Sequence, residues 1–183
     1  MSFTQPSSSS SAPGSGDVAT TTVRPSATEA DLQRLRIGSL LMAIAGLGFI
    51  GYGVLFFFRN FSSSFLELGI GRQEVSVGKD EIQAFSPSLY DYIGHLHIAL
   101  SGFIAATGLA TAALAWFGVR RGHLWAWVTA VAAPVLALAV ALPDHYPNHF
   151  DTLGHLGLIY ADTVLFVVGA VLALIGLRTT TTE

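Results

Sequence analysis

The sequence DYIGHL at residues 91–96 opens one long apolar stretch, and DTLGHL at residues 151–156 opens another. Both copies fit the pattern D-x-[I/L]-G-H-L, and each lies where a polar segment meets a run of apolar residues. In a helix, an aspartate and a histidine four positions apart lie on one face, one turn from each other. The pattern therefore predicts two helices that each carry a histidine near one end, at similar depth.

The composition indicates a membrane protein. Of the 183 residues, 51% are hydrophobic and only 11% are charged. The apolar residues form four blocks, each close to or above the ~20 residues that cross a bilayer as a helix. We expect an all-α fold, a four-helix transmembrane bundle, with spans at about 37–58, 92–119, 124–142 and 153–177. The longest connection is an outer loop at 59–91.

Polar segments flank the predicted membrane domain, residues 31–178. Residues 1–30 are rich in Ser, Thr, Pro and Gly. They have too little apolar surface to offset the entropy of ordering them, so we expect a disordered cytoplasmic tail. Residues 179–183 form a short polar tail. Thr28, followed three positions later by Asp31, predicts a capping box at the start of the first helix.

The outer loop and the second span carry further local signals. Residues 71–85 alternate enough between polar and apolar types to permit a short hairpin. Ser86 and Pro87 form a good N-cap and first-turn pair for the next helix. That helix has small residues on two faces, so we expect it to be the central one, with neighbours on both sides.

Basic residues near the span ends predict the orientation in the membrane, because they concentrate on the cytoplasmic side. With a cytoplasmic N-terminus, six of the nine basic residues lie inside and three lie outside. The inner six are Arg24, Arg34, Arg36, Arg120, Arg121 and Arg178. We expect a multi-pass protein of the cell membrane with both termini cytoplasmic and with both D-x-[I/L]-G-H-L copies on the outer side.

Several function classes are excluded. The chain has no cysteine, so it has no disulfide, thiolate metal site or cysteine nucleophile. A formal net charge of −3 gives no basic surface for nucleic acid. Walker, zinc-protease, nucleophile-elbow and dinucleotide-binding patterns are missing from the sequence. We therefore favour a non-catalytic protein whose partners are the lipid bilayer and another copy of itself or another membrane protein.

A Trp-rich inner face and a His-bearing outer loop accompany the four spans. The tryptophans are Trp116, Trp125 and Trp127, and a second, shorter outer loop at 143–150 carries His145 and His149. This arrangement resembles many small four-span prokaryotic membrane proteins. The resemblance concerns the span pattern and implies no functional residue.

The two motif histidines, His95 and His155, are the predicted metal ligands, because inward-facing histidines on two helices build metal and haem sites in bundle cores. Asp91 and Asp151, one turn away, would fix the tautomers of the rings. One metal ion would require ring nitrogens only ~3–4 Å apart. The second and fourth spans would then be neighbours, related by an approximate two-fold axis.

We favour a transition metal over haem, because small residues on both helices argue against the wide slot that haem needs. The competing interpretation has no cofactor. In it, the two aspartates stabilise the helix N-termini and each histidine hydrogen-bonds to a loop.

Asp162 is the one acidic residue well inside an apolar run. It lies about 10 Å below His155 along the helix axis. A carboxylate at that depth is costly, and by default it is paired, protonated or functional. His97, Ser101 and Tyr160 are its candidate partners, and His97 and Asp162 are the candidate buried polar residues.

We expect the other outer histidines, His145 and His149, to form a histidine cluster with His95 and His155. Pro147 lies between them and argues against a helix that would present both to one ion. We expect a solvated loop, or a mouth over the site.

Three functions follow, in order of preference. The first is an integral membrane protein without catalysis. The second is a metal- or haem-binding protein that uses His95 and His155. The third is a small proton-linked transporter that uses Asp162.

Overall fold

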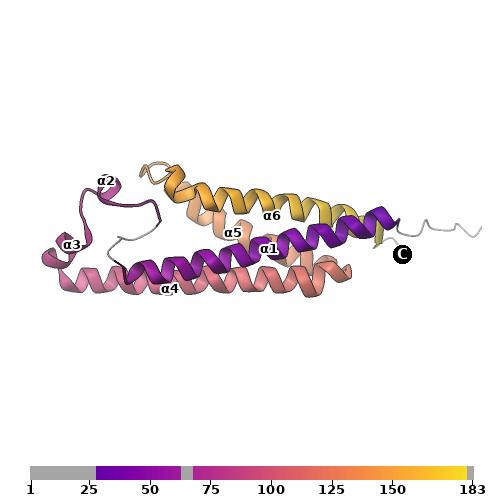
Figure 1. Cartoon of the computed structure of the whole chain (residues 1–183), viewed down its shortest axis with the longest axis horizontal. Coiled ribbons are helices and arrows are strands. Elements are labelled where there is room, and N and C mark those ends of the chain that lie inside the picture. Colours follow the sequence, from indigo (N-terminus) through magenta and orange to yellow (C-terminus); the bar gives the residue numbers. More distant parts are fainter. Residues whose placement is uncertain (1–27, 63–67, 181–183) are drawn as a thin grey trace, which may run out of the picture.

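The computed structural model describes residues 28–62 and 68–180 of the chain. Within these two ranges every regular element is a helix. Four helices are long: α1 (Glu29–Asn60), α4 (Pro87–Ala113), α5 (Leu124–Ala141) and α6 (Leu153–Thr180). They run alternately up and down in one bundle (Figure 1). Most of the predicted disordered tail lies outside the described residues.

Four helical stretches in the described ranges are long and apolar enough to cross a membrane. The second continues from α4 through a π-helical turn, η1 (Leu114–Gly118), and a 3₁₀ turn, η2 (Val119–Arg121). The third ends in another 3₁₀ turn, η3 (Leu142–Asp144). The stretches contain all four predicted spans, so the all-α prediction with four apolar helices is confirmed.

The central helix is α1, which lies between α4 and α6, with α5 behind them (Figure 1). Glycines make this possible, because they let two backbones approach closely. A Cβ atom added to Gly46 would lie 2.7 Å from the carbonyl oxygen of Gly108 in α4. One added to Gly38 would lie 2.6 Å from the carbonyl oxygen of Gly169 in α6. The prediction that the second span is central is therefore wrong.

The position of α1 also overturns a second prediction. The second and fourth spans, α4 and α6, both pack along α1 and have little contact with each other. They are therefore not the direct neighbours that a two-fold repeat of the D-x-[I/L]-G-H-L copies requires.

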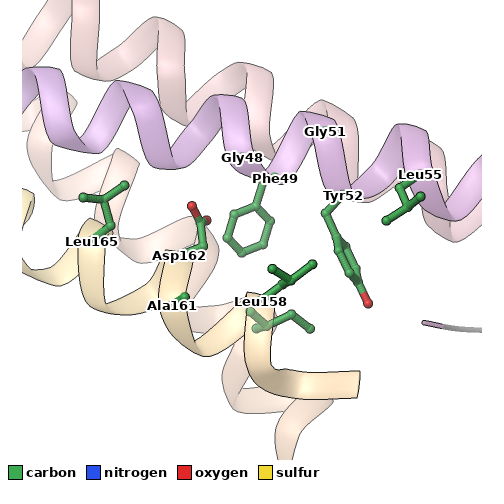
Figure 2. Close-up of a pocket in the computed structure, with 10 residues that line it drawn as sticks. Gly48, Phe49, Gly51, Tyr52, Leu55, Leu158, Ala161, Asp162 and Leu165 are labelled. Atoms are coloured by element: carbon green, nitrogen blue, oxygen red, sulfur yellow. The ribbon is translucent and has the colours of Figure 1, made fainter. Parts of the chain in front are cut away.

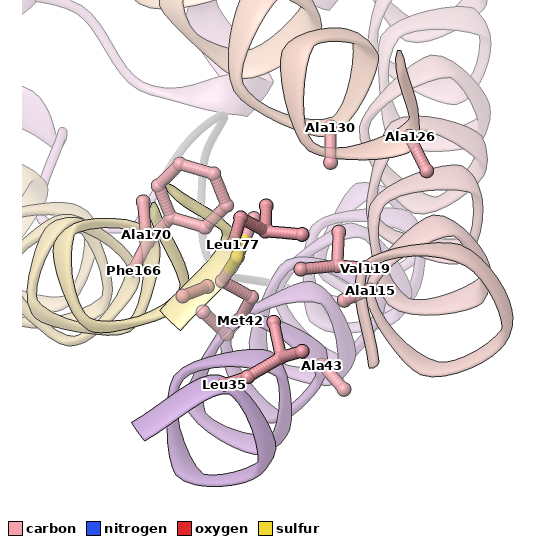
Figure 3. Packing of buried hydrophobic residues seen from close by; sticks show 12 residues of the cluster. Leu35, Met42, Ala43, Ala115, Val119, Ala126, Ala130, Phe166, Ala170 and Leu177 are labelled. Carbon is pink, nitrogen blue, oxygen red and sulfur yellow. The ribbon is translucent and has the colours of Figure 1, made fainter. Parts of the chain in front are cut away.

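The apolar core lies toward the end of the bundle where α1 begins (Figure 3). There α5 packs through Ala126 and Ala130 against the end of the second stretch, and both alanines are fully buried. The indole nitrogen of Trp127 donates a hydrogen bond to the carbonyl oxygen of Ala170 in α6, at 2.9 Å. Small side chains and this hydrogen bond attach α5 to the second stretch and to α6.

The outer loop contains two short helices, α2 (Arg72–Val75) and α3 (Lys79–Phe85), so the predicted hairpin is wrong. A glycine precedes each helix, and a glutamate three positions later accepts a hydrogen bond from the glycine N–H. This spacing caps a helix start. The bond from the Gly78 N–H, with a contribution from Arg72, holds the pKa of Glu81 below its ordinary value.

Lys79 fixes α3 over the end of α1. Its Nζ atom donates to the carbonyl oxygens of Asn60, at 3.1 Å, and Ser62, at 3.0 Å. A cation at this position stabilises the C-terminal end of α1, where the helix dipole is negative. The loop at 59–91 is thereby tied to the four-helix bundle.

The predicted helix starts are confirmed at two places. The hydroxyl of Thr28 accepts from the Asp31 N–H, and α1 begins at Glu29, two residues inside the predicted tail. The hydroxyl of Ser86 accepts from the Leu89 N–H and caps α4. At its other end the chain remains helical to Thr180, beyond the predicted limit of the last span.

The two motif copies differ in their relation to the helix ends. Asp91 lies inside α4, beyond its first turn, whereas Asp151 precedes the start of α6. The hydroxyl of Thr152 accepts from the His155 N–H at 3.2 Å at the start of α6. The same six-residue pattern therefore occupies two different structural settings.

Candidate functional site

The first candidate site is a cavity of about 410 Å³ between α1 and α6. Its walls come from residues 48–55 of α1 and residues 158–165 of α6 (Figure 2). Asp162 is the one charged residue that lines it, the aromatic ring of Phe49 lies beside its carboxyl group, and Tyr52 lies farther along the cavity. The cavity is thus an apolar space with a single ionisable group.

The Asp162 carboxyl group is held in an unusual setting. Its Oδ2 atom is buried and has no hydrogen-bond partner among the described residues. A Cβ atom added to Gly48 would lie 2.5 Å from Oδ1, so a larger residue at position 48 would require this carboxyl group to move. Gly46 and Gly48 lie ~200° apart around the helix, which explains how α1 presents one glycine to α4 and the other to Asp162.

The three predicted partners of Asp162 are engaged elsewhere. The ring of His97 lies edge-on to Phe56, with ring centres 5.1 Å apart. The hydroxyl of Ser101 donates to a carbonyl oxygen of its own helix at 2.7 Å. The hydroxyl of Tyr160 is hydrogen-bonded to another tyrosine at 2.9 Å. His97 and Ser101 belong to α4, and α1 separates that helix from α6.

The second candidate site surrounds His95, at the end of the bundle where α1 ends and α4 begins. His95 is exposed and lines a cavity of about 520 Å³ between the end of α1, α3 and α4. Asp91 and His97 line the same cavity, together with the cationic residues Arg59 and Lys79. This cavity is therefore lined by one acidic and two basic side chains, in addition to the histidines.

The third candidate site contains His155, whose side chain is almost completely buried. Its Nδ1 atom lies 2.8 Å from the carbonyl oxygen of Leu68, and its Nε2 atom lies 3.1 Å from the Nε2 atom of His145. The Nδ1 atom of His145 lies 2.9 Å from the carbonyl oxygen of Ala141, at the end of α5. Three contacts thus involve all four ring nitrogens.

The structure brings His155 together with His145, and not with His95. The metal-binding roles of His95 and His155 stay a prediction. The group that orients the His155 ring is the Leu68 carbonyl oxygen, where the sequence suggested Asp151. Asp151 and Asp91 are both exposed.

His145, Gly48 and Leu68 were missed as site residues from the sequence. For His145 a signal was present, because a short connection joins the third and fourth spans and reverses the chain. Residues ten positions apart on either side of such a reversal come close together. For Gly48 and Leu68 no local signal exists, because each contacts a residue of α6, which lies far away in the sequence.

Within the described ranges, no group of three or more His, Cys, Asp or Glu side chains is placed to hold one metal ion. No protein-family model, curated protein or solved structure matches this chain. A function can therefore be inferred only from the geometry of the sites.

Proposed function

We propose that this chain is a multi-pass protein of the cell membrane, with both termini cytoplasmic, that exchanges a proton for a lipophilic cation at Asp162. The observation that carries the proposal is the Asp162 side chain, which lines an apolar cavity and whose buried Oδ2 atom has no hydrogen-bond partner among the described residues.

The outer surface of the long helices supports a bilayer location. Large apolar side chains are exposed along them, among them Phe103 at 72%, Leu136 at 66% and Val140 at 73%. Water-soluble monomers rarely expose contiguous apolar surface on this scale. Lipid acyl chains would cover these side chains without cost.

The distribution of charge supports the orientation. The start of α1 and the end of the second stretch lie at the same end of the bundle (Figure 1). A cavity of about 460 Å³ there is lined by Arg36, Arg120 and Arg121 with Trp116 and Phe117, and by no acidic residue. The guanidinium group of Arg120 lies 4.2 Å from the centre of the Trp116 ring. Arginines and tryptophans at one end are typical of the cytoplasmic membrane surface.

The exchange follows from the cost of burying charge. An ionised carboxylate without a partner is strongly disfavoured in an apolar cavity. Asp162 therefore carries a proton when the cavity holds no cation. A cation that enters can pair with the carboxylate only after the proton leaves, so one cation replaces one proton. This coupling is the elementary step of a proton-linked carrier.

The walls indicate the kind of cation. Binding sites for small molecules are mostly apolar cavities of ~300–1,000 Å³ with few polar groups, and the Asp162 cavity fits this description. Phe49 and Tyr52 offer aromatic faces, which attract cations. An aromatic monocation matches both features, and ethidium is a suitable fluorescent probe.

The orientation predicts the labelling of single cysteines, which is a clean measurement because the chain has none of its own. Asp80→Cys lies on an exposed position of α3, and Arg121→Cys on an exposed position of η2. We expect a membrane-impermeant maleimide to label position 80 in intact cells and to label position 121 only after the membrane is opened. The reverse pattern would contradict the proposed orientation.

Asp162→Asn is expected to weaken ethidium binding by about ten- to a hundredfold, because a charge-assisted contact contributes about 1.5–3 kcal/mol. The change keeps the size of the side chain and removes its charge. Binding by the unchanged protein should strengthen as the pH rises, since cation binding releases a proton. Binding by the variant should not depend on pH. Fluorescence titration of the detergent-purified full chain between about pH 5 and 8 measures both effects.

Asp151→Asn is the matched control, because Asp151 is exposed and precedes the same helix. It should bind ethidium as the unchanged protein does. Equal affinity and equal pH dependence in the Asp162 and Asp151 variants would show that Asp162 does not carry the exchange.

A further inference from the structure

We propose that His145 and His155 form a binding site for one divalent transition-metal ion at the outer end of the bundle. This site lies beyond the proposed function, because it uses neither Asp162 nor its cavity. It differs from the metal site predicted from the sequence, because the partner of His155 is His145 in the connection between α5 and α6.

The hydrogen bonds assign the tautomers of both rings. A carbonyl oxygen only accepts, so the Nδ1 atom of His155 donates to Leu68 and that of His145 donates to Ala141. A neutral imidazole carries one N–H. Both Nε2 atoms are then unprotonated when the rings are neutral, and their lone pairs face each other at 3.1 Å. Two acceptors at this distance repel, so the arrangement favours a positively charged species that both nitrogens contact.

The spacing fits a metal ion with two adjacent nitrogen ligands. At Zn–N distances of ~2.0–2.1 Å, nitrogens 3.1 Å apart subtend ~100° at the ion. This angle lies between those of adjacent ligands in octahedral and tetrahedral geometry. Haem would hold its two axial nitrogens ~4 Å apart on opposite sides of the iron, so the pair is too close for it.

The surroundings of the rings match those of metal-binding histidines. Such histidines nearly always donate the other ring N–H to a carbonyl or carboxylate oxygen, which fixes the tautomer and raises the basicity of the ligand. Both rings do so here. His155 is buried, with an exposed fraction of 1%. It provides the fixed half of the site.

His145 provides the adjustable half. The two ring planes are inclined by only 19° and the ring centres lie 5.1 Å apart. Because the nitrogens are 3.1 Å apart, they point nearly straight at each other. A metal ion cannot fit on the line between the two Nε2 atoms, so it would bind to one side of that line after one ring rotates. His145 is half-buried and lies in the connection after η3, so its ring has more room to rotate than the buried ring of His155.

The expected ion is one that prefers imidazole, such as Zn²⁺, Co²⁺, Ni²⁺ or Cu²⁺. The described ranges place no third His, Cys, Asp or Glu in the same cluster. Water would therefore complete the coordination shell, and the site would bind more weakly than a closed structural zinc site. An ion with open positions is also accessible to small anionic ligands from outside.

The test uses the full chain, purified in detergent and stripped of metal with a chelator. Co²⁺ is the first probe because its visible spectrum reports the coordination geometry, and Zn²⁺ competition then gives its affinity. We expect one ion per chain, and at least tenfold weaker binding in His145→Gln. His149→Gln is the matched control, because it removes an exposed histidine from the same connection. His145→Gln is preferred to His155→Gln because a buried substitution at His155 could disturb folding.

Two results would overturn the proposal. One is equal Co²⁺ and Zn²⁺ affinity in the His145 and His149 variants. The other is a ¹⁵N-histidine spectrum that shows a proton shared by the two Nε2 atoms and does not change with excess Zn²⁺. Asp162→Asn should bind metal as the unchanged protein does, so this result separates the metal site from the cation exchange.

Discussion

Gly46→Ala is expected to weaken the contact between α1 and α4 and to destabilise the whole bundle. The added methyl carbon would lie 2.7 Å from the Gly108 carbonyl oxygen and 2.7 Å from the Ala112 backbone nitrogen. Both atoms belong to the backbone, so the methyl group can be accommodated only if the helices move apart. Overpacking of this kind costs about 1–3 kcal/mol. Because α1 contacts both α4 and α6, the loss extends beyond one pair of helices.

Gly51→Ala is the matched control on the same helix, because nothing lies within 4 Å of the position where its Cβ would be. Alanine has the higher helix propensity, so this change should leave stability equal or slightly increased. Unfolding of the purified protein by a denaturing detergent, followed by circular dichroism, compares the two variants. If Gly46→Ala unfolds at the same detergent fraction as Gly51→Ala, the close backbone contact at Gly46 is wrong.

Gly69→Ala is expected to displace the outer loop from the start of α6. Gly69 has φ +75°, in the left-handed region, where a residue with a Cβ is disfavoured by roughly 1–2 kcal/mol. Its Cβ would also collide with the carbonyl carbon of Gly154 and the backbone nitrogen of His155. Leu68 is adjacent, so its carbonyl oxygen would move away from the His155 ring. His155 would then lose the contact that fixes its tautomer.

The measurement is the ¹⁵N-histidine spectrum, in which the His155 Nδ1 signal should move toward that of a ring free to exchange tautomers. Gly71→Ala provides the comparison, since its φ of −151° is accessible to any residue and its Cβ would lie 3.7 Å from the nearest atom. This variant should keep the His155 signal. An unchanged signal in Gly69→Ala would mean that the loop does not hold the ring.

The residues that form the candidate sites could be predicted only in part. Asp162 stands out in the sequence because a carboxyl group inside an apolar run is rare, and its place in a cavity agrees with that signal. Its partners could not be predicted. Whether a side chain on one helix meets another depends on the angle and spacing between the helices, and α1 separates the proposed partners on α4 from α6.

The histidines illustrate the same limit. The repeated D-x-[I/L]-G-H-L pattern directed attention to His95 and His155, because identical local sequence suggests identical local structure. The structure gives the two copies different positions relative to their helix ends, and it supplies His155 with a partner from the adjoining connection. A pattern within one segment carries no information about which other segment lies opposite.

The four apolar helices, their approximate ends and the caps at Thr28 and Ser86 could all be predicted from the sequence. These features depend on the hydrophobicity of a continuous segment and on hydrogen bonds between residues three positions apart, and both are local. The central place of α1, the contact of Gly48 with Asp162 and the pairing of His155 with His145 follow from the packing of the helices. Each of these outcomes depends on two surfaces that fit together, such as Gly46 against Gly108. The free energy of such a contact belongs to the pair of helices, so neither helix alone reveals it.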